Sequence, residues 1–243
     1  MKTGLVSVTF RNLSPMEIIH LTAKANLDGI EWGGDIHAPP GDLPAAKKIQ
    51  EMMTQNQLQC LSYGSYYKCR DGEDFTGILA VAKVLRVPNI RIWAGEKGSA
   101  QTDPQTRKKI VDNIRRVADM AGEKGIDISF EYHANTLTDT VESTVQLLNE
   151  TAGPNVYTYW QPYGPDTASN LRDIRILKGL NKLKNLHVYH WLGDQRLPLA
   201  EGRQAWEQYI AEAQAEAALL EFVRDGTPEQ FMQDAKVLLE LSR

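Results

Sequence analysis

Cysteine is scarce in this sequence, and its few copies form no pattern. Cys60 and Cys69 are the only two among 243 residues, too few for a disulfide-stapled scaffold and without the repeated spacing of a thiolate metal site. The chain also lacks an apolar run long enough to cross a bilayer, and Arg11 and Asn12 interrupt the first apolar segment before a signal-peptide core forms. We therefore expect a protein of a reducing, cytoplasmic compartment.

An excess of positive charge is also absent. The 27 Lys and Arg residues against 31 Asp and Glu residues give a net charge of −4. Surfaces that bind nucleic acid or anionic lipid are usually basic, so this balance argues against a nucleic-acid or membrane partner. The composition, with 42% hydrophobic and 24% charged residues, is that of a folded globular chain. A small-molecule ligand is the remaining expectation.

The sequence does contain a regular alternation of short apolar runs and longer segments of helical period. The short runs predict strands at residues 5–10, 29–32, 58–63, 89–93, 127–133, 155–161, 185–191 and 218–222. A capping residue followed by a proline predicts the start of several helices, as in Ser14-Pro15 and Asp103-Pro104. Eight β-then-α units without a linker predict one α/β domain over residues 1–243, a single-domain (β/α)8 TIM barrel.

In such a barrel the functional groups lie at the C-terminal ends of the strands. Ionisable and aromatic side chains gather at the expected ends: Glu31, Trp32, Trp93, Glu131, His133, Trp160, Gln161, His187, His190, Trp191 and Glu221. A carboxylate inside an apolar run, such as Glu131 in ISFEYH or Glu221 in ALLEFV, is costly to bury unless it is paired or binds a metal. One such residue could be a structural ion pair, but their recurrence on several strands favours a functional site.

Carboxylate, imidazole and amide donors together suit one divalent ion per chain, such as Mn, Co, Mg or Zn. An ion of this kind beside a carboxylate base suits removal of a proton from the carbon next to a carbonyl. The tryptophans predict an aromatic pocket for the apolar faces of a sugar or polyol, although each alone could equally cap the core. His37, in the loop after the second strand, is expected to reach over the same mouth.

Four segments, in order, resemble the xylose-isomerase-like barrels of the sugar-phosphate isomerase and epimerase family, which includes hydroxypyruvate isomerases, ketose 3-epimerases and inosose dehydratases. The segments are LDGIEWGGDIHAP, FEYHANTLTDT, KNLHVYHW and LLEFVRDGTPEQ. The resemblance implies that Glu131 and Glu221 are the catalytic acid and base, and that both bind the metal together with His187.

Two positions depart from the family pattern. Gln161 stands where the family has a metal-binding Asp, and His190 stands where many relatives have Asp. A Gln oxygen can still be the fourth ligand but brings no negative charge, so we expect weaker metal binding.

The resemblance implies a metal-dependent isomerase or epimerase of a sugar, sugar phosphate or polyol that works through an enediolate. Substrate contacts are expected from His37, Glu31, Trp93, His133, Trp160, His190 and Trp191. Two alternatives remain: an inosose-type dehydratase on the same site, and a non-catalytic polyol-binding barrel with a decayed metal site. The related zinc endonucleases fit less well, since they need more histidines and a basic face. Phosphorylation of the substrate and formation of a homo-oligomer stay open.

Overall fold

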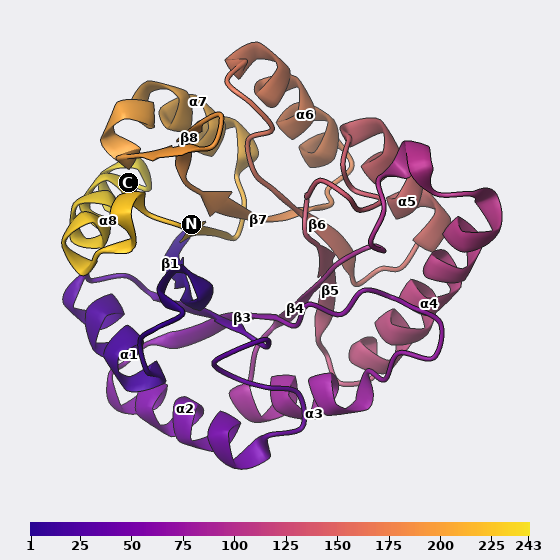
Figure 1. The fold of residues 1–243 in the computed structure, drawn as a ribbon, viewed down its shortest axis with the longest axis horizontal. Helices are drawn as coiled ribbons and strands as arrows, with labels where there is room; N and C mark the ends of the chain where they lie inside the picture. The colour runs from indigo at the N-terminus through magenta and orange to yellow at the C-terminus, as the bar shows by residue number, and fades with distance from the viewer.

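Eight parallel strands close into a barrel in the computed structural model, which describes all 243 residues. The strands of the barrel are β1 (Lys2–Val6), β2 (Gly29–Gly33), β3 (Gln59–Gly64), β4 (Asn89–Ile92), β5 (Asp127–Phe130), β6 (Val156–Trp160), β7 (Leu183–Val188) and β10 (Ala217–Leu220). β1 pairs with both β2 and β10, so the first and last strands complete the ring (Figure 1). The predicted (β/α)8 barrel is confirmed.

Helices surround the barrel on all sides (Figure 1). They are α1 (Pro15–Lys24), α2 (Leu43–Gln55), α3 (Thr76–Leu85), α4 (Pro104–Gly122), α5 (Val141–Thr151), α6 (Thr167–Gly179), α7 (Arg203–Ala213) and α8 (Pro228–Leu241), with short 3-10 segments η1 (Ser7–Phe10), η2 (Ser99–Gln101), η3 (Leu199–Gly202) and η4 (Arg224–Gly226). Ser14 caps α1 in a full capping box, and Asp103 caps α4, as their sequences predict. None of these helices has the length and apolar character that crossing a membrane requires.

Several strands end earlier than the sequence predicts. The expected strand 5–10 stops at Val6, because Ser7–Phe10 turns into η1 and the Ser7 hydroxyl accepts a hydrogen bond from the Gly33 N–H at 2.8 Å. β5 stops at Phe130 and β6 at Trp160. Glu131 and Gln161 are therefore the first residues of the loops at the barrel mouth.

A small hairpin after β7 replaces the last part of the expected strand 185–191. β8 (His190–Leu192) and β9 (Gln195–Leu197) pair antiparallel, with Trp191 opposite Arg196. Gly193, at a φ of 59°, forms the turn with Asp194. A Gly-Asp pair between two short apolar runs is a hairpin signal, so the sequence did contain a sign of this feature.

A layer of buried polar side chains crosses the barrel interior below the mouth. The Tyr159 hydroxyl donates to Glu31 Oε2 at 2.8 Å and accepts hydrogen bonds from the Asn89 and Asn185 amides. Asn89 Oδ1 in turn accepts from the Ser129 hydroxyl at 2.6 Å. These bonds join β2, β4, β5, β6 and β7 from the inside of the barrel and fix Glu31 from below.

We expect Tyr159→Phe to lower the free energy of unfolding by about 1.5–3 kcal/mol, because it removes a hydrogen bond to a buried carboxylate. Tyr157→Phe is the matched control on the same strand, since the Tyr157 hydroxyl makes no hydrogen bond and its ring lies beneath Lys182 and Lys184. Denaturant unfolding of the two variants measures the difference. Equal stabilities would contradict this role of the polar layer.

Candidate metal centre and active site

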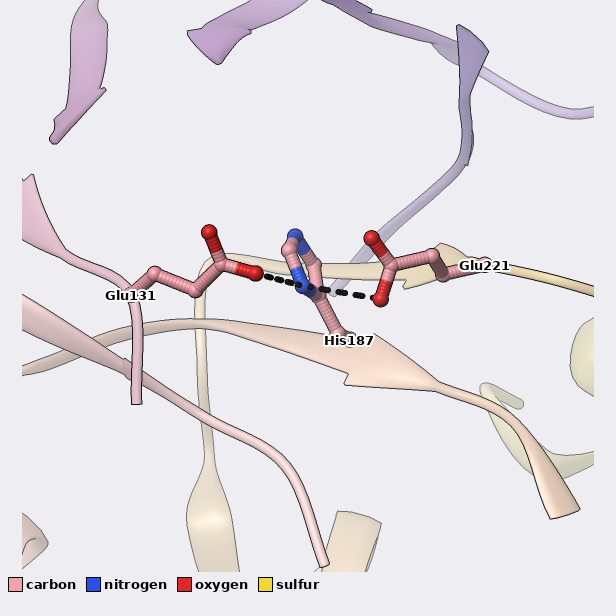
Figure 2. A group of neighbouring side chains, drawn as sticks. All are labelled: Glu131, His187 and Glu221. Carbon is pink, nitrogen blue, oxygen red and sulfur yellow. Dashed lines mark ion pairs between the residues drawn. The ribbon is translucent and has the colours of Figure 1, made fainter. Parts of the chain in front are cut away.

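Two carboxylates flank one imidazole at the barrel mouth (Figure 2). Glu131 follows β5, His187 lies near the end of β7 and Glu221 follows β10. His187 Nδ1 is 3.3 Å from Glu221 Oε2 and 3.9 Å from Glu131 Oε1, and one ligand atom from each residue lies within 4.8 Å of the others. All three residues are buried. The structure thus brings together the three residues that the sequence identified as acid, base and ligands.

Gln161 completes the same cluster. Its Oε1 lies 3.2 Å from His187 Nδ1. In β6 the Tyr159 side chain points into the barrel, and alternation along the strand sends Gln161 to the same side. The uncharged amide oxygen therefore lies beside the same His187 nitrogen that faces the two carboxylates.

A buried arginine that the sequence analysis missed lies beside this cluster. Arg91 on β4 donates from Nε to Glu31 Oε1 at 2.7 Å and from Nη1 to Glu131 Oε2, and its side chain is 1% exposed. Gly64 on β3 leaves room for it, since a Cβ there would lie 2.5 Å from Arg91 Nη2. Arg91 stands in the apolar run NIRI, so the rule that singled out Glu131 could have found it.

Electrostatics in the cluster favour charged forms despite deep burial. Burial alone would lower the pKa of His187, but the Glu221 and Glu31 carboxylates raise it to about 9. Burial alone would raise the pKa of Glu31, but Arg91 and His187 hold that pKa well below its usual range. The pKa of Glu221 is likewise lowered against burial, chiefly by His187 and then by Arg91. The buried carboxylates of the site therefore stay ionised only because positive groups lie beside them.

The charges and the donor orientation fit a divalent cation. Glu31, Glu131 and Glu221 carry three negative charges and Arg91 one positive charge. Without an ion, a protonated His187 adds one positive charge. A histidine that binds a metal is neutral, and with a neutral imidazole the interior is two charges short of balance. His187 Nε2 lies 3.5 Å from Glu31 Oε1, which leaves Nδ1 for the ion. Metal-binding histidines commonly direct their second nitrogen at a carboxylate in this way. The buried Glu131, His187 and Glu221 are consistent with a divalent metal site.

One wall of the mouth beside Glu131 is aromatic. The Trp93 and His133 rings stack at 4.7 Å between centroids, and Trp93 Nε1 donates to Glu131 Oε2. The Tyr66 ring also contacts Trp93, with centroids 6.1 Å apart, and lies 5.2 Å from the Arg91 guanidinium carbon. Trp93 and His133 are therefore placed next to the cluster, as a substrate-contacting role requires.

The wall beside Glu221 is aromatic as well. Trp191 on β8 packs against Phe222, with centroids 6.1 Å apart, and Phe222 directly follows Glu221. The Arg196 guanidinium carbon lies 5.2 Å from the Trp191 ring and 4.8 Å from the Phe222 ring. Trp191 is thus also placed at the mouth, together with two residues that the sequence analysis did not select.

Glu31 and Trp160 do not have the positions that substrate contact requires. Glu31 is fully buried beneath the cluster, where Arg91 and Tyr159 already occupy its two oxygens. Trp160 points away from the interior and packs against Trp206 and Tyr209 of α7, with ring centroids 6.2 and 5.1 Å away. Alternation along β6 explains this, because a strand that directs Tyr159 inward must direct Trp160 outward.

His37 and His190 both contact neighbouring segments of the chain. His37 Nδ1 lies 3.0 Å from the Ser7 hydroxyl and Nε2 lies 3.2 Å from the Leu13 carbonyl oxygen, so both nitrogens hold neighbouring loops together. The His190 ring packs against η3, where a Cβ on Gly202 would lie 2.6 Å from its Nδ1. These contacts occupy both ring nitrogens of His37 and one face of the His190 ring, and the substrate-contacting role of the two histidines stays a prediction.

We expect Arg91→Gln to lower the free energy of unfolding by about 3–5 kcal/mol, because it leaves two buried carboxylates without their counter-ion. Adding Glu31→Gln in the same chain should recover part of this loss, since the double variant keeps the net charge of the interior. Arg70→Gln is the matched control: Arg70 also pairs with a glutamate, Glu96 at 2.7 Å, but on the surface. Thermal unfolding measures the loss of stability in each variant. Equal losses in Arg91→Gln and Arg70→Gln would contradict the role of Arg91 as the counter-ion of the buried carboxylates.

Comparison with known proteins agrees with this architecture. The family model described as "Xylose isomerase-like TIM barrel" matches residues 19–241. The 3-dehydroshikimate dehydratase of Bacillus anthracis is 25% identical over 244 residues, which cover 87% of this chain and 86% of the relative.

Solved structures share the fold over their whole length. The probable 3-DHS dehydratase AsbF from Bacillus anthracis superposes with a TM-score of 0.82 at 22% identity, covering 98% of this chain and 99% of that one. D-Psicose 3-epimerase with D-tagatose, from Clostridium cellulolyticum H10, superposes with a TM-score of 0.74 at 16% identity, covering 100% and 98%. Since the family model spans nearly the whole sequence, the chain belongs to the xylose isomerase-like TIM barrel family.

Proposed function

We propose that this protein is a metal-dependent lyase that removes water from a cyclic β-hydroxy ketone of the 3-dehydroshikimate type. The observation that carries the proposal is the pair of carboxylates, Glu131 and Glu221, on opposite sides of the ligand-like His187 nitrogen (Figure 2). The 25% identity with a 3-dehydroshikimate dehydratase across most of both chains supports this choice of substrate. It favours dehydration over the isomerase or epimerase that we expected first.

Glu131, Gln161, His187 and Glu221 would hold the metal ion, which when bound supplies a positive charge that polarises the ketone oxygen. Ligand atoms of Glu131, His187 and Glu221 already lie within 4.8 Å of one another, and Gln161 Oε1 lies 3.2 Å from His187 Nδ1. Gln161 lies in this set, so its exchange for the family's Asp does not remove a donor. This argues against a decayed site in a non-catalytic binding barrel.

The proton step is assigned to Glu221. Glu131 Oε2 already accepts hydrogen bonds from both Arg91 and Trp93, whereas the nearest charged partner of the Glu221 carboxylate is the His187 imidazole, with Oε2 3.3 Å from Nδ1. Glu221 therefore takes the proton from the carbon next to the ketone. His133 has Nδ1 2.6 Å from the Ala134 carbonyl oxygen, so Nδ1 is the donor of this bond and Nε2 is left as a hydrogen-bond acceptor for a substrate hydroxyl.

Water is lost when the electrons left on the α-carbon form a double bond to the β-carbon, whose hydroxyl departs with a proton. With 3-dehydroshikimate, loss of one further ring proton and its return to oxygen give the aromatic 3,4-dihydroxybenzoate, so the net change is one water. No oxidant is needed. Trp93 beside Glu131 and Trp191 beside Phe222 offer flat apolar surfaces that such a ring could contact.

Epimerisation of a ketose is the second candidate function. The same α-proton abstraction leads to an epimer if the proton returns to the other face, and carboxylates on opposite sides of the cluster allow this. The two functions differ in their product: dehydration yields an aromatic compound, whereas epimerisation yields only a sugar isomer.

We expect the protein with Mn²⁺ to convert 3-dehydroshikimate to 3,4-dihydroxybenzoate, and chelator to abolish the conversion. Proton NMR in D2O, run beside D-tagatose and D-psicose, distinguishes aromatic product from epimers and from simple deuterium exchange. Glu221→Gln should reduce kcat by about 10²–10⁴-fold, the usual contribution of a positioned acid or base.

Glu216→Gln is the control, because Glu216 directly precedes β10, at the end of the strand opposite Glu221, and its exposed side chain pairs with Lys184, which also pairs with Asp127. It should leave both kcat and stability nearly unchanged. Aromatic product formed equally well by the Glu221 variant would contradict the proposed base, and epimers without aromatic product would favour the second candidate.

A further inference from the structure

We propose that Arg196, on the β8–β9 hairpin, binds the carboxylate of the substrate and makes the enzyme select anionic cyclic ketones over neutral sugars. The proposal rests on the function proposed above and adds the residue that determines its specificity. Sequence alone gave Arg196 no position relative to the site.

Arg196 lacks the counter-ion that its neighbours have. Among arginines in the loops that follow the barrel strands, Arg11 pairs with Asp35, Arg70 with Glu96 and Arg224 with Asp225. Arg196 has no carboxylate within 4.0 Å and its guanidinium makes no hydrogen bond within the chain. Its charge and its five N–H donors are therefore free for a ligand.

The guanidinium is held in place by stacking. It lies over Phe222 at 4.8 Å and over Trp191, its cross-strand neighbour in the hairpin, at 5.2 Å. Aromatic contacts of this kind fix the flat face of an arginine by cation–π attraction. Its edge stays open, and a guanidinium edge matches the two oxygens of a carboxylate in a bidentate pair.

The backbone after β10 connects this arginine to the proposed base. Phe222 follows Glu221 and adopts a φ of 53°, a left-handed conformation that costs a bulky residue free energy and is typical of functional sites. Its N–H donates to the Thr9 hydroxyl at 3.1 Å, which holds the turn. The ring is thereby directed at Trp191, and Arg196 is stacked on the residue next to Glu221.

The charge balance of the barrel interior is a second, independent reason to expect an anionic substrate. Because Gln161 is neutral, a divalent ion would bring the cluster of Glu31, Arg91, Glu131 and Glu221 to zero net charge. A carboxylate at position 161 would leave the loaded site negative and would repel an anion. A neutral centre with a free guanidinium at its rim is suited to a substrate with one negative charge.

The test measures binding of 3,4-dihydroxybenzoate and of catechol, which has the same two hydroxyls but no carboxylate, by calorimetry on the Mn²⁺-loaded protein. We expect Arg196→Gln to weaken 3,4-dihydroxybenzoate binding by about 10–100-fold, as loss of a charge-assisted hydrogen bond does. Catechol binding should not change. In turnover of 3-dehydroshikimate, Arg196→Gln should raise KM with little effect on kcat. The KM of Arg196→Lys should lie between those of the wild type and Arg196→Gln.

Arg224→Gln is the matched control, an arginine of η4 whose charge is already paired with Asp225 at 3.0 Å. It should bind both compounds like the wild type. Ribose 5-phosphate, whose anion is a phosphate, is titrated alongside. Tight, Arg196-dependent binding of this compound without binding of 3,4-dihydroxybenzoate would overturn the assignment to a carboxylate.

The outcomes separate the two proposals. Wild-type protein that neither binds 3,4-dihydroxybenzoate nor turns over 3-dehydroshikimate would overturn the proposed function and with it the role of Arg196. Turnover by the wild type with equal KM and equal 3,4-dihydroxybenzoate affinity in Arg196→Gln would leave the function standing and overturn the specificity role alone.

Discussion

The Arg91 guanidinium lies between Glu31 and Glu131 inside the closed barrel, and the geometry of the mouth depends on it. Burying one guanidinium and three carboxylates is costly unless each is paired in good geometry. Arg91 meets that condition by donating to two of them, Gly64 gives it room, and Tyr159 fixes Glu31 from below. Without Arg91, three like charges would surround His187 and the cluster would have to open.

The same pairing explains why the remaining donors can serve chemistry. His187 Nε2 lies 3.5 Å from Glu31 Oε1, and Nδ1 faces Glu131, Gln161 and Glu221. Arg91 and Trp93 hold Glu131, which leaves Glu221 as the less constrained carboxylate. A site that needs two positive charges, with one fixed and one free carboxylate, is suited to a divalent ion and a proton acceptor. Gln161 then determines the charge of the loaded site without removing a donor.

Much of this architecture follows from the sequence, for a physical reason. Closed parallel sheets place the residues after each strand on one rim, so Glu131, His187, Gln161 and Glu221 could be predicted to meet without any knowledge of their distances. Arg91 was overlooked because its strand was read for polar groups only at its end, yet a charge within NIRI is as costly to bury as Glu131.

Other features depend on contacts that periodicity does not reveal. The orientation of Trp160 follows from alternation only once Tyr159 is known to point inward. The Ser7 and Leu13 contacts that occupy the His37 ring nitrogens join separate loops, and the packing of His190 on Gly202 depends on the β8–β9 turn. The same turn places Arg196 over Phe222, so the specificity residue became visible only with the hairpin.

The most direct test of the charge-balance account is a crystal structure of the protein soaked in Mn²⁺, with anomalous scattering used to locate the ion. The account predicts one strong peak per chain, bonded to Glu131, Glu221, Gln161 Oε1 and His187 Nδ1, with Glu31 still paired to Arg91. A mouth without a peak, or an ion bound elsewhere while His187 Nδ1 remains hydrogen-bonded to Gln161, would contradict it.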